Sequence, residues 1–299
     1  MMASTVASGI HGTKKDRFSC EDNATSMLAA RLLNATRLSD GALIALKIVR
    51  HSNNPEEVEI SKFLTSEPLQ SDTSNHCVPI YDTVLVPDDD DIVIMVMPLL
   101  RKYISPAFHT VGEAIECFRQ ILEGLQFMHK NLVAHRDCMN LNIMMDANNL
   151  YVYPFHPVDH HMKRDFSGYA HFKTRTERPP KYYFIDFGLS HRYVSIDNAL
   201  DLPVWGGDKQ VPEFRNYDCP HNPFPTDVFY IGHAIKEDFL DVLKRFETIW
   251  GALSKWKLRS RVVDSDESTL EQIFGTVWNW ARQLEFVVRR LSAHPWPAS

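Results

Sequence analysis

The chain has 299 residues, of which 44% are hydrophobic and 23% charged, and its formal net charge at pH 7 is −6. The composition is that of an ordinary globular protein, and the length is enough for one large core or for two smaller lobes that share a cleft. The negative charge argues against binding of nucleic acid or of an anionic membrane over the whole surface, so we expect neither partner.

The sequence predicts no membrane-spanning helix. The longest strongly apolar run, "IVIMVMPLL" at 92–100, has nine residues, whereas a membrane-spanning helix needs about 20. Residues 1–19 lack the continuous apolar segment of a secretory signal, and we expect them to be disordered, with a transit peptide as the alternative. Five cysteines without C-x-x-C spacing indicate a reduced cytoplasmic or nuclear protein.

The first part of the chain predicts short strands and one helix. The run "LIALKIV" at 43–49 has a β-type pattern and carries a single lysine, Lys47. Pro55 suits the first turn of a helix, and "EEVEISKFL" follows it with acids near the N-terminus. Residues 78–86 and 91–100 predict two further strands, and we expect the "PDDDD" segment that joins them to be a solvated loop.

Helical patterns dominate the rest of the chain. Residues 111–130 predict a helix with one buried face, because apolar side chains recur at steps of three and four: Ile115, Phe118, Leu122, Leu125 and Met128. The spacing of Ser268 and Glu271 suits a capping box, and the apolar stripe that follows predicts a helix that packs on its own domain, with a partner-binding seam as the alternative. We therefore predict an α+β fold of two lobes, a small and mainly β lobe and a larger helical one.

Two polar motifs have the chemistry of phosphoryl transfer. "HRDCMNLN" supplies Arg136, Asp137 and Asn142, and "DFG" supplies Asp186. The reaction needs neutralised phosphate charge, a held metal and an oriented hydroxyl. Carboxylate and amide oxygens suit Mg²⁺, so Asn142 and Asp186 are candidate metal ligands. Asp137 would orient the substrate hydroxyl, and Lys47 would meet the phosphates of the nucleotide.

At this point the chain resembles the eukaryotic protein kinase superfamily, over about residues 25–240. "IALK" resembles the lysine motif of the third strand, and this implies that Lys47 anchors the phosphates and pairs with a helix glutamate. Glu57 fits that partner best because apolar residues follow it at core-facing offsets, and Glu59 is the second choice. The implied fold is bilobal, and the implied cofactors are ATP and Mg²⁺.

The resemblance extends to the hinge and to the activation segment. In "VMPLL" it implies that Met97 is the gatekeeper and that the carbonyl of Pro98 and the N–H of Leu100 contact adenine. "VPEF" at 211–214 resembles the motif that closes the activation segment. "DVFYIG" resembles the start of the central helix of the larger lobe, in which Asp227 would brace the catalytic loop.

The sequence departs from the kinase pattern at two places that take part in the chemistry. The glycine-rich loop of the family aligns with "CEDNATSM" at 20–27, which contains no glycine, although glycines let the backbone approach the phosphates closely. Met139 stands where serine/threonine kinases carry a lysine, and the loop matches neither the serine/threonine nor the tyrosine version. We expect a protein substrate that accepts phosphate on serine or threonine in preference to tyrosine.

The sequence also departs from the kinase pattern by a long insertion and by a missing segment. Residues 143–185 separate the two motifs, where kinases have a short hairpin, and the insert at about 147–180 predicts a lid near the cleft or a partner-docking loop. Its four histidines lack a cysteine pair that would support zinc. This insertion, with "FIDFGLS" after it, resembles the insertion of a divergent group of fungal kinase-like proteins. No D-P-x-x-R segment follows "GHAIKEDFL", so Glu213 is expected to pair with Arg215 or Arg282, or the usual helices are absent.

We predict a kinase-like domain at 20–245, with an N-lobe at about 20–99 and a C-lobe at about 100–245, and a helical extension at 246–299. The predicted function is transfer of the γ-phosphate of ATP to a protein hydroxyl, slowly or in a divergent manner. The alternatives are an inactive pseudokinase that binds partners through the insert or the last helix, and a small-molecule phosphotransferase. The retention of all three charged residues that the chemistry needs favours the enzyme: Lys47, Asp137 and Asp186.

Overall fold

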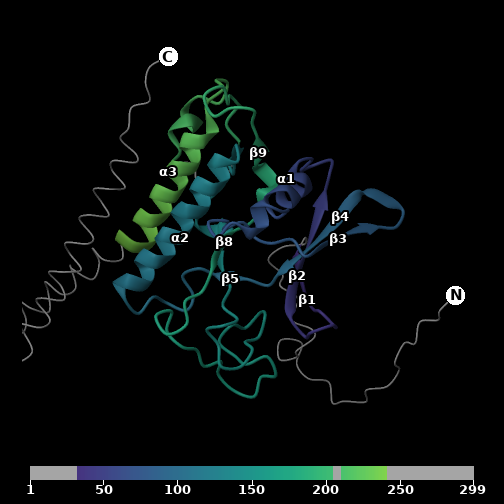
Figure 1. Cartoon of the computed structure of the whole chain (residues 1–299), viewed down its shortest axis with the longest axis vertical. Coiled ribbons are helices and arrows are strands. Elements are labelled where there is room, and N and C mark those ends of the chain that lie inside the picture. The colour runs from purple at the N-terminus through teal and green to yellow at the C-terminus, as the bar shows by residue number, and fades with distance from the viewer. Residues whose placement is uncertain (1–31, 205–209, 241–299) are drawn as a thin grey trace, which may run out of the picture.

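The computed structural model describes residues 32–204 and 210–240. Within them a β-sheet with one helix forms an N-terminal lobe, and two helices lie side by side in a second lobe (Figure 1). This is the mixed α+β arrangement that the sequence predicts. One hydrophobic cluster includes buried residues of both lobes, among them Val49 and Met95 of the sheet and Phe118 and Ile231 of the two helices.

The sheet of the N-terminal lobe is antiparallel, with strand order β1-β2-β4-β3. Its strands are β1 (Leu32–Thr36), β2 (Leu43–Arg50), β3 (Asp82–Val86) and β4 (Asp89–Pro98). The predicted strand at 43–49 is confirmed, and in the register Lys47 lies opposite Met95 of the central strand β4.

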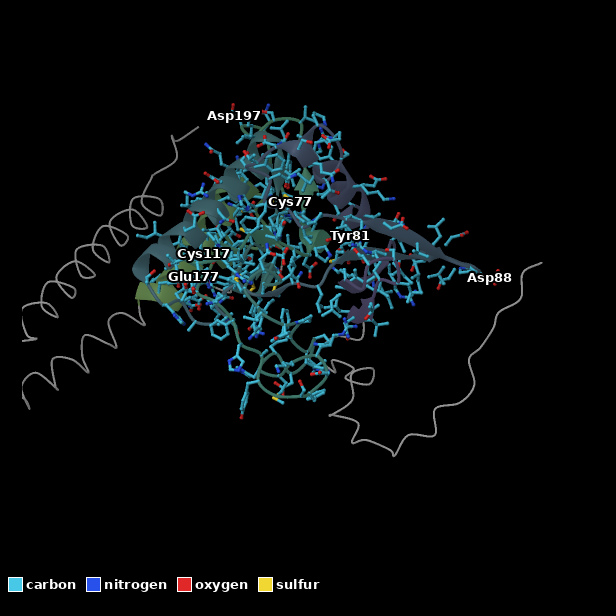
Figure 2. All side chains as sticks on the ribbon, turned by 60° about the horizontal axis from the view of Figure 1, so that its bottom comes forward. Cys77, Tyr81, Asp88, Cys117, Glu177 and Asp197 are labelled. Atoms are coloured by element: carbon cyan, nitrogen blue, oxygen red, sulfur yellow. The ribbon has the colours of Figure 1, made fainter. Side chains whose placement is uncertain are left out.

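The hairpin between β3 and β4 differs from the prediction at both ends. The first strand begins only at Asp82, because Cys77 and Val78 pair with Phe184 of the other lobe instead. The predicted solvated loop is shorter than expected: Asp88 and Asp90 are exposed, but Asp89 already belongs to β4 and pairs with Val86. The turn between β3 and β4 ends at Asp88, which has a φ of 65°. Figure 2 places Asp88 at the outer tip of the hairpin.

The helix α1 (Glu57–Leu64) follows β2 as predicted and lies beside the sheet (Figure 1). Its buried side chains include Val58, Ile60 and Leu64, which recur at the spacing of one helical face. Glu57 lies on the same buried side and is only 1% exposed, so its charge needs partners within the protein.

The helix α2 (Val111–Lys130) has the predicted bounds. Thr110 caps it by accepting a hydrogen bond from Glu113 N, and Glu113 in turn accepts one from His109 N at 2.7 Å, a reciprocal pattern that satisfies free N–H groups of the first turn. The prediction that Leu122 faces the core is wrong, because this side chain is 37% exposed. The core face runs instead through Cys117, Ile121, Leu125 and Met128.

The helix α3 (Pro223–Ile235) packs beside α2 and continues into a short π-helical turn, η5 (Lys236–Leu240). Asn222 caps its N-terminus by accepting a hydrogen bond from Phe224 N at 3.1 Å. No described helix has the length and apolar character to cross a membrane.

Short strands of the second lobe position the two polar motifs. They are β5 (Arg101–Lys102), β6 (Val133–Ala134), β7 (Ile143–Met145), β8 (Tyr182–Phe184) and β9 (His191–Arg192). Strand β6 pairs with β9, and β8 pairs with β7. The "HRD" motif follows β6 and the "DFG" motif follows β8, and this pairing brings the two motifs together.

Single 3-10 turns complete the described chain: η1 (Leu69–Ser71), η2 (Asn140–Asn142), η3 (Phe187–Leu189) and η4 (Pro212–Arg215). The glycine-free segment at 20–27 and the predicted helix that begins near Ser268 lie outside the described residues. The disordered segment 1–19, the extension 246–299 and Arg282 lie outside them as well. All of these stay predictions.

The insert has a structure of its own, built around Arg101 of β5. This side chain is 2% exposed, and its guanidinium lies over the rings of Tyr151 and Phe155, 5.4 and 5.3 Å from their centroids. It also donates a hydrogen bond to the carbonyl of His160 at 2.9 Å. Isolated β-bridges, such as the one between Met162 and Tyr169, hold the loop together, and in Figure 1 it lies below β5 and β1.

One arginine of the insert reaches the N-terminal lobe. Arg164 donates hydrogen bonds to Thr36 Oγ1 and to the carbonyl of Gly41, at the turn between β1 and β2. His156 of the insert forms hydrogen bonds within the loop: its Nδ1 accepts from Val158 N and from Asp159 N. No group of three metal-ligating side chains is found in the part of the chain that the structure describes.

Candidate active site

The charged centre of the site is a three-residue cluster at the junction of the lobes. Lys47 of β2 hydrogen-bonds to Glu57 of α1, and its Nζ also lies 2.8 Å from Asp186 Oδ1. Glu57 is therefore the helix partner, and Glu59 is exposed on the opposite side of α1. The ion pairs connect a strand, a helix and the "DFG" turn.

The electrostatics of this cluster favour the charged forms of Lys47 and Asp186. Burial lowers the pKa of Lys47, but the nearby carboxylates of Asp186 and Glu57 outweigh it, and the pKa of Lys47 ends above its ordinary value. Burial raises the pKa of Asp186, yet the ammonium of Lys47 brings it below the ordinary value. An ammonium that stays charged is what a phosphate-binding site needs.

The backbone of the "DFG" turn presents Asp186 to the cleft. Asp186 adopts left-handed backbone angles, with φ 63°, and its side chain is 47% exposed. The next residue, Phe187, is buried against the ring of His135, with ring centroids 5.1 Å apart. The buried aromatic ring thus anchors the turn, while the carboxylate beside it remains accessible.

The helix α3 holds the loop that carries the "HRD" motif through Asp227. Asp227 is fully buried and accepts hydrogen bonds from His135 N at 2.8 Å and from Arg136 N at 2.7 Å. It also lies 3.0 Å from His129 Nε2 of α2. These contacts agree with the bracing expected of Asp227, and they stabilise Arg136 at its unusual φ of 66°.

Asp137 and Asn142 are oriented by each other. Asn142 Nδ2 donates hydrogen bonds to the carbonyl of Asp137 at 2.7 Å and to its Oδ2 at 2.9 Å. These bonds assign the amide nitrogen to Asp137, and the amide oxygen of Asn142 accepts no hydrogen bond from a described residue. That oxygen and the exposed carboxylate of Asp186 are hard donors, so the residues present fit Mg²⁺.

Arg136 makes its side-chain contacts outside this cluster. Its Nη1 lies 3.0 Å from Asp201 Oδ2, and its Nη2 donates to the carbonyl of Leu202 at 2.9 Å. Tyr193 donates a second hydrogen bond to Asp201 at 3.0 Å. Arg136 therefore connects the catalytic loop to the segment that follows "DFG", and its contribution is to position that segment.

The hinge residues lie where β4 ends. Met97 is buried and pairs with Ala45, and Pro98 pairs with Ile44 of β2. Leu100 is half-buried and packs against the hydrophobic core. The contacts of Pro98 and Leu100 with adenine stay predictions.

Met139 is half-buried and packs against the hydrophobic core. It lines a cavity with Tyr230 and His233 of α3. A lysine at this position would be expected to keep its ammonium in water, so the methionine replaces a mobile cation by an apolar contact with α3.

Glu213 does not have the partner that was expected within the described chain. Its Oε2 is buried without a hydrogen-bond partner there, and Arg215, the expected cation, is exposed. No ion pair joins Glu213 and Arg215 in the described chain, so this expected pair is wrong, and the alternative pair with Arg282 stays a prediction.

Two contributors to the site were not predicted from the sequence. Asn54 donates a hydrogen bond to Glu57 Oε2 at 3.0 Å, and Asp201 pairs with Arg136. Asn54 looks like an ordinary polar residue before a helix, and Asp201 like a loop acid. Asn54 lies three residues before Glu57, so its contact is local, whereas only the packing of distant segments brings Asp201 to Arg136.

Comparisons with known proteins agree with this geometry. The family model of the protein kinase domain matches residues 29–198, which is more than half of the chain. Mouse NUAK family SNF1-like kinase 1 is 25% identical over 141 residues, which are 45% of this chain and 21% of the mouse protein.

Two proteins of Saccharomyces cerevisiae are similar as well. Serine/threonine-protein kinase CAK1 is 28% identical over 126 residues, 42% of this chain and 26% of that protein. Nitrogen permease reactivator protein is 32% identical over 121 residues, 39% of this chain and 15% of that protein. The matched segments thus span about a quarter or less of these relatives. With its motifs assembled between two lobes and a family model that covers most of them, this chain belongs to the protein kinase domain family.

Proposed function

We propose that the protein is an active, slow protein kinase that transfers the γ-phosphate of ATP to a protein hydroxyl. The observation that carries the proposal is that each charged group needed for the reaction has its own orienting partner. Glu57 holds Lys47, Lys47 holds Asp186, and Asn142 holds Asp137. Such preorganised groups are the main source of catalysis in phosphoryl transfer.

In this proposal Lys47 binds the phosphates of ATP, and Asn142 and Asp186 bind Mg²⁺, which when bound neutralises charge on the phosphate oxygens. Asp137 orients the acceptor hydroxyl and accepts its proton. Pro98 and Leu100 contact adenine through the backbone. A missing oriented donor typically costs a few kcal/mol in the transition state, so the replacement of lysine by Met139 slows transfer without abolishing it.

The acceptor is proposed to be serine or threonine in preference to tyrosine. The similarity to a serine/threonine-protein kinase supports this choice, and the small-molecule phosphotransferase becomes the weaker alternative. The insert at 147–180 supports the proposed kinship with divergent fungal kinase-like proteins. A cytoplasmic or nuclear location, without a nucleic-acid or membrane partner, remains part of the proposal.

The second candidate function is a pseudokinase that binds partners through the insert or the last helix. Two observations favour it: the aligned glycine-rich loop has no glycine, and the insert is a folded unit that presents exposed side chains such as Tyr153 and Tyr169. The two functions differ in their expected response to nucleotide.

The deciding experiment combines nucleotide binding with transfer. Thermal unfolding is measured with and without Mg²⁺–ATP for the wild type and for Asp186→Ala. At about 100 times its dissociation constant, a ligand adds roughly 2.7 kcal/mol of stability, which is a shift of several degrees. We expect this shift in the wild type, with a requirement for Mg²⁺, and no shift in Asp186→Ala.

Transfer is then followed with radiolabelled ATP, on the protein itself and on casein. Asp137→Ala should abolish incorporation, because Asp137 is the group proposed to orient the hydroxyl and accept its proton. Asp90→Ala, which removes an exposed acid from β4, serves as the matched control and should keep full activity. Undiminished transfer by Asp137→Ala would refute the proposed mechanism, and the absence of any shift at millimolar ATP would favour the pseudokinase.

A further inference from the structure

The carboxylate of Glu57 has two oxygens, and Lys47 uses only one of them. Oε1 hydrogen-bonds to the ammonium of Lys47, whereas Oε2 accepts a hydrogen bond from Asn54 Nδ2 at 3.0 Å. Because Glu57 is 1% exposed, water does not replace a missing donor, and an unpaired carboxylate oxygen would be unfavourable there. The amide of Asn54 therefore completes the coordination of this carboxylate.

The backbone around Asn54 is fixed on both sides. Asn54 N donates to the carbonyl of Arg50 at 2.9 Å, and the carbonyl of Asn54 accepts from Glu57 N at 3.4 Å. The residue thus sits in the short connection between β2, which carries Lys47, and α1, which carries Glu57. Its side chain fixes the carboxylate relative to the strand that holds the lysine.

The contact cannot be explained as an ordinary helix cap. The N-cap of α1 is Glu56, whose side chain makes no capping hydrogen bond. A capping side chain accepts hydrogen bonds from the free N–H groups of the first turn. Asn54 instead donates from its amide nitrogen, and the acceptor is the side chain of Glu57.

The "DFG" turn leaves room for this amide. A Cβ atom at position 188 would lie 2.3 Å from Asn54 Nδ2 and 3.2 Å from Glu57 Oε2. Glycine at this position therefore permits the close approach of Asn54, and any larger residue would displace the amide from Glu57. Asn54 lies between α1 and the turn that carries Asp186.

We propose that Asn54 is a positioning residue of the phosphate-anchoring group: its amide fixes Glu57, and through Glu57 it fixes the ammonium of Lys47. The inference rests on the proposed function as far as the anchored ligand is a nucleotide phosphate. The placement of Lys47 by Asn54 is a property of the free protein, and it is tested without nucleotide.

The first measurement is the rate of acetylation of Lys47 by acetic anhydride, followed by mass spectrometry of the nucleotide-free protein. The exposed Lys102 of β5 is the internal reference. In Asn54→Ala the carboxylate loses a donor and its fixed orientation, so Lys47 spends more time unpaired. We expect its acetylation to rise by about three- to tenfold, since a lost hydrogen bond to a charged group has an effect of that order.

The matched control is Asn53→Ala, because Asn53 is the exposed neighbour in the same connection. It should leave the acetylation of Lys47 unchanged. Asn54→Ser is a milder second variant in case Asn54→Ala fails to fold, and it should raise the rate in the same direction. The second measurement is the dissociation constant of Mg²⁺–ATP, which we expect to weaken by about three- to tenfold in the Asn54 variants alone.

The outcomes separate this inference from the proposed function. If Lys47 is acetylated at the same relative rate in the Asn54 variants and in Asn53→Ala, the positioning role is refuted, even where the Asn54 variants are less stable. If acetylation of Lys47 rises but the wild type does not bind Mg²⁺–ATP, Asn54 positions the lysine as inferred and the proposed function fails.

Discussion

At the scale of single residues, the site depends on buried charges that compensate each other. Glu57 is almost fully buried, and its partners are Lys47 on one oxygen and Asn54 on the other. A buried carboxylate without a cation is strongly unfavourable, whereas the intact pair is nearly neutral for stability. The contacts of Glu57 therefore fix the position of Lys47 and add little to the stability of the fold.

The corresponding prediction concerns Lys47→Met. Breaking a buried ion pair typically costs about 3–5 kcal/mol, and since Lys47 keeps some solvent contact, we expect a loss of about 2–3 kcal/mol in the free energy of unfolding. Urea denaturation measures it. Lys102→Met, at an exposed position of β5, should change stability by less than about 0.5 kcal/mol. Equal losses in the two variants would contradict the role of Lys47 as the compensating charge.

At the scale of elements, short strands and loops are positioned by side chains from elsewhere. Asp227 of α3 holds the catalytic loop by two backbone N–H groups. Arg101 of β5 holds the insert by hydrogen bonds and by two aromatic rings. Both loops consist mainly of irregular backbone with single bridges or turns, so a buried polar side chain contributes strongly to the conformation of each.

Replacement of Arg101 by leucine should release the insert without unfolding the domain. The carbonyl of His160 would lose its donor, and the rings of Tyr151 and Phe155 would lose the cation that contacts both of them. Hydrogen exchange measured by mass spectrometry should show faster exchange in peptides from 151–172 and unchanged exchange in α2. Lys102→Leu, one residue along β5, is the control. Equal protection of the insert in Arg101→Leu would show that the loop is held by other contacts.

At the scale of the whole molecule, the ion pair between Lys47 and Asp186 joins the two lobes, and a core cluster continues from one to the other. The insert adds a further connection through Arg164 and Thr36. Relative motion of the lobes is thus opposed at the cleft and at the turn between β1 and β2. The ion pair makes this connection sensitive to pH.

Lys47 lowers the pKa of Asp186 in the folded protein, although burial acts in the opposite direction. A carboxyl with a lowered pKa contributes stability above its ordinary value of 3.8, and the contribution is lost as the pH falls through the folded value. The difference in unfolding free energy between the wild type and Asp186→Asn should therefore be largest near neutral pH and should shrink below about pH 4. Denaturant titrations at several pH values measure it, with the exposed Asp90→Asn as control. A constant difference down to about pH 3 would contradict the ion pair.

Much of the site was predictable because its motifs are contiguous in the sequence. The bounds of α2 and the strand around Lys47 follow from periodicity, and the choice of Glu57 over Glu59 follows from the apolar spacing of α1. Errors arose where a neighbouring segment decided the outcome. Leu122 is exposed because the buried face of α2 runs through Cys117 and Ile121, and Asp89 joins β4 because Val86 pairs with it.

The sequence by itself determined the family, the two-lobed plan and the identity of the charged residues, because these depend on short motifs and on local periodicity. The tertiary structure alone decided which side chains hold those residues in place. Asp227 meets the catalytic loop only once α3 packs beside α2, and Asp201 meets Arg136 only once β9 pairs with β6. The physical reason is that a hydrogen bond between distant residues depends on packing geometry, which no local pattern of the chain specifies.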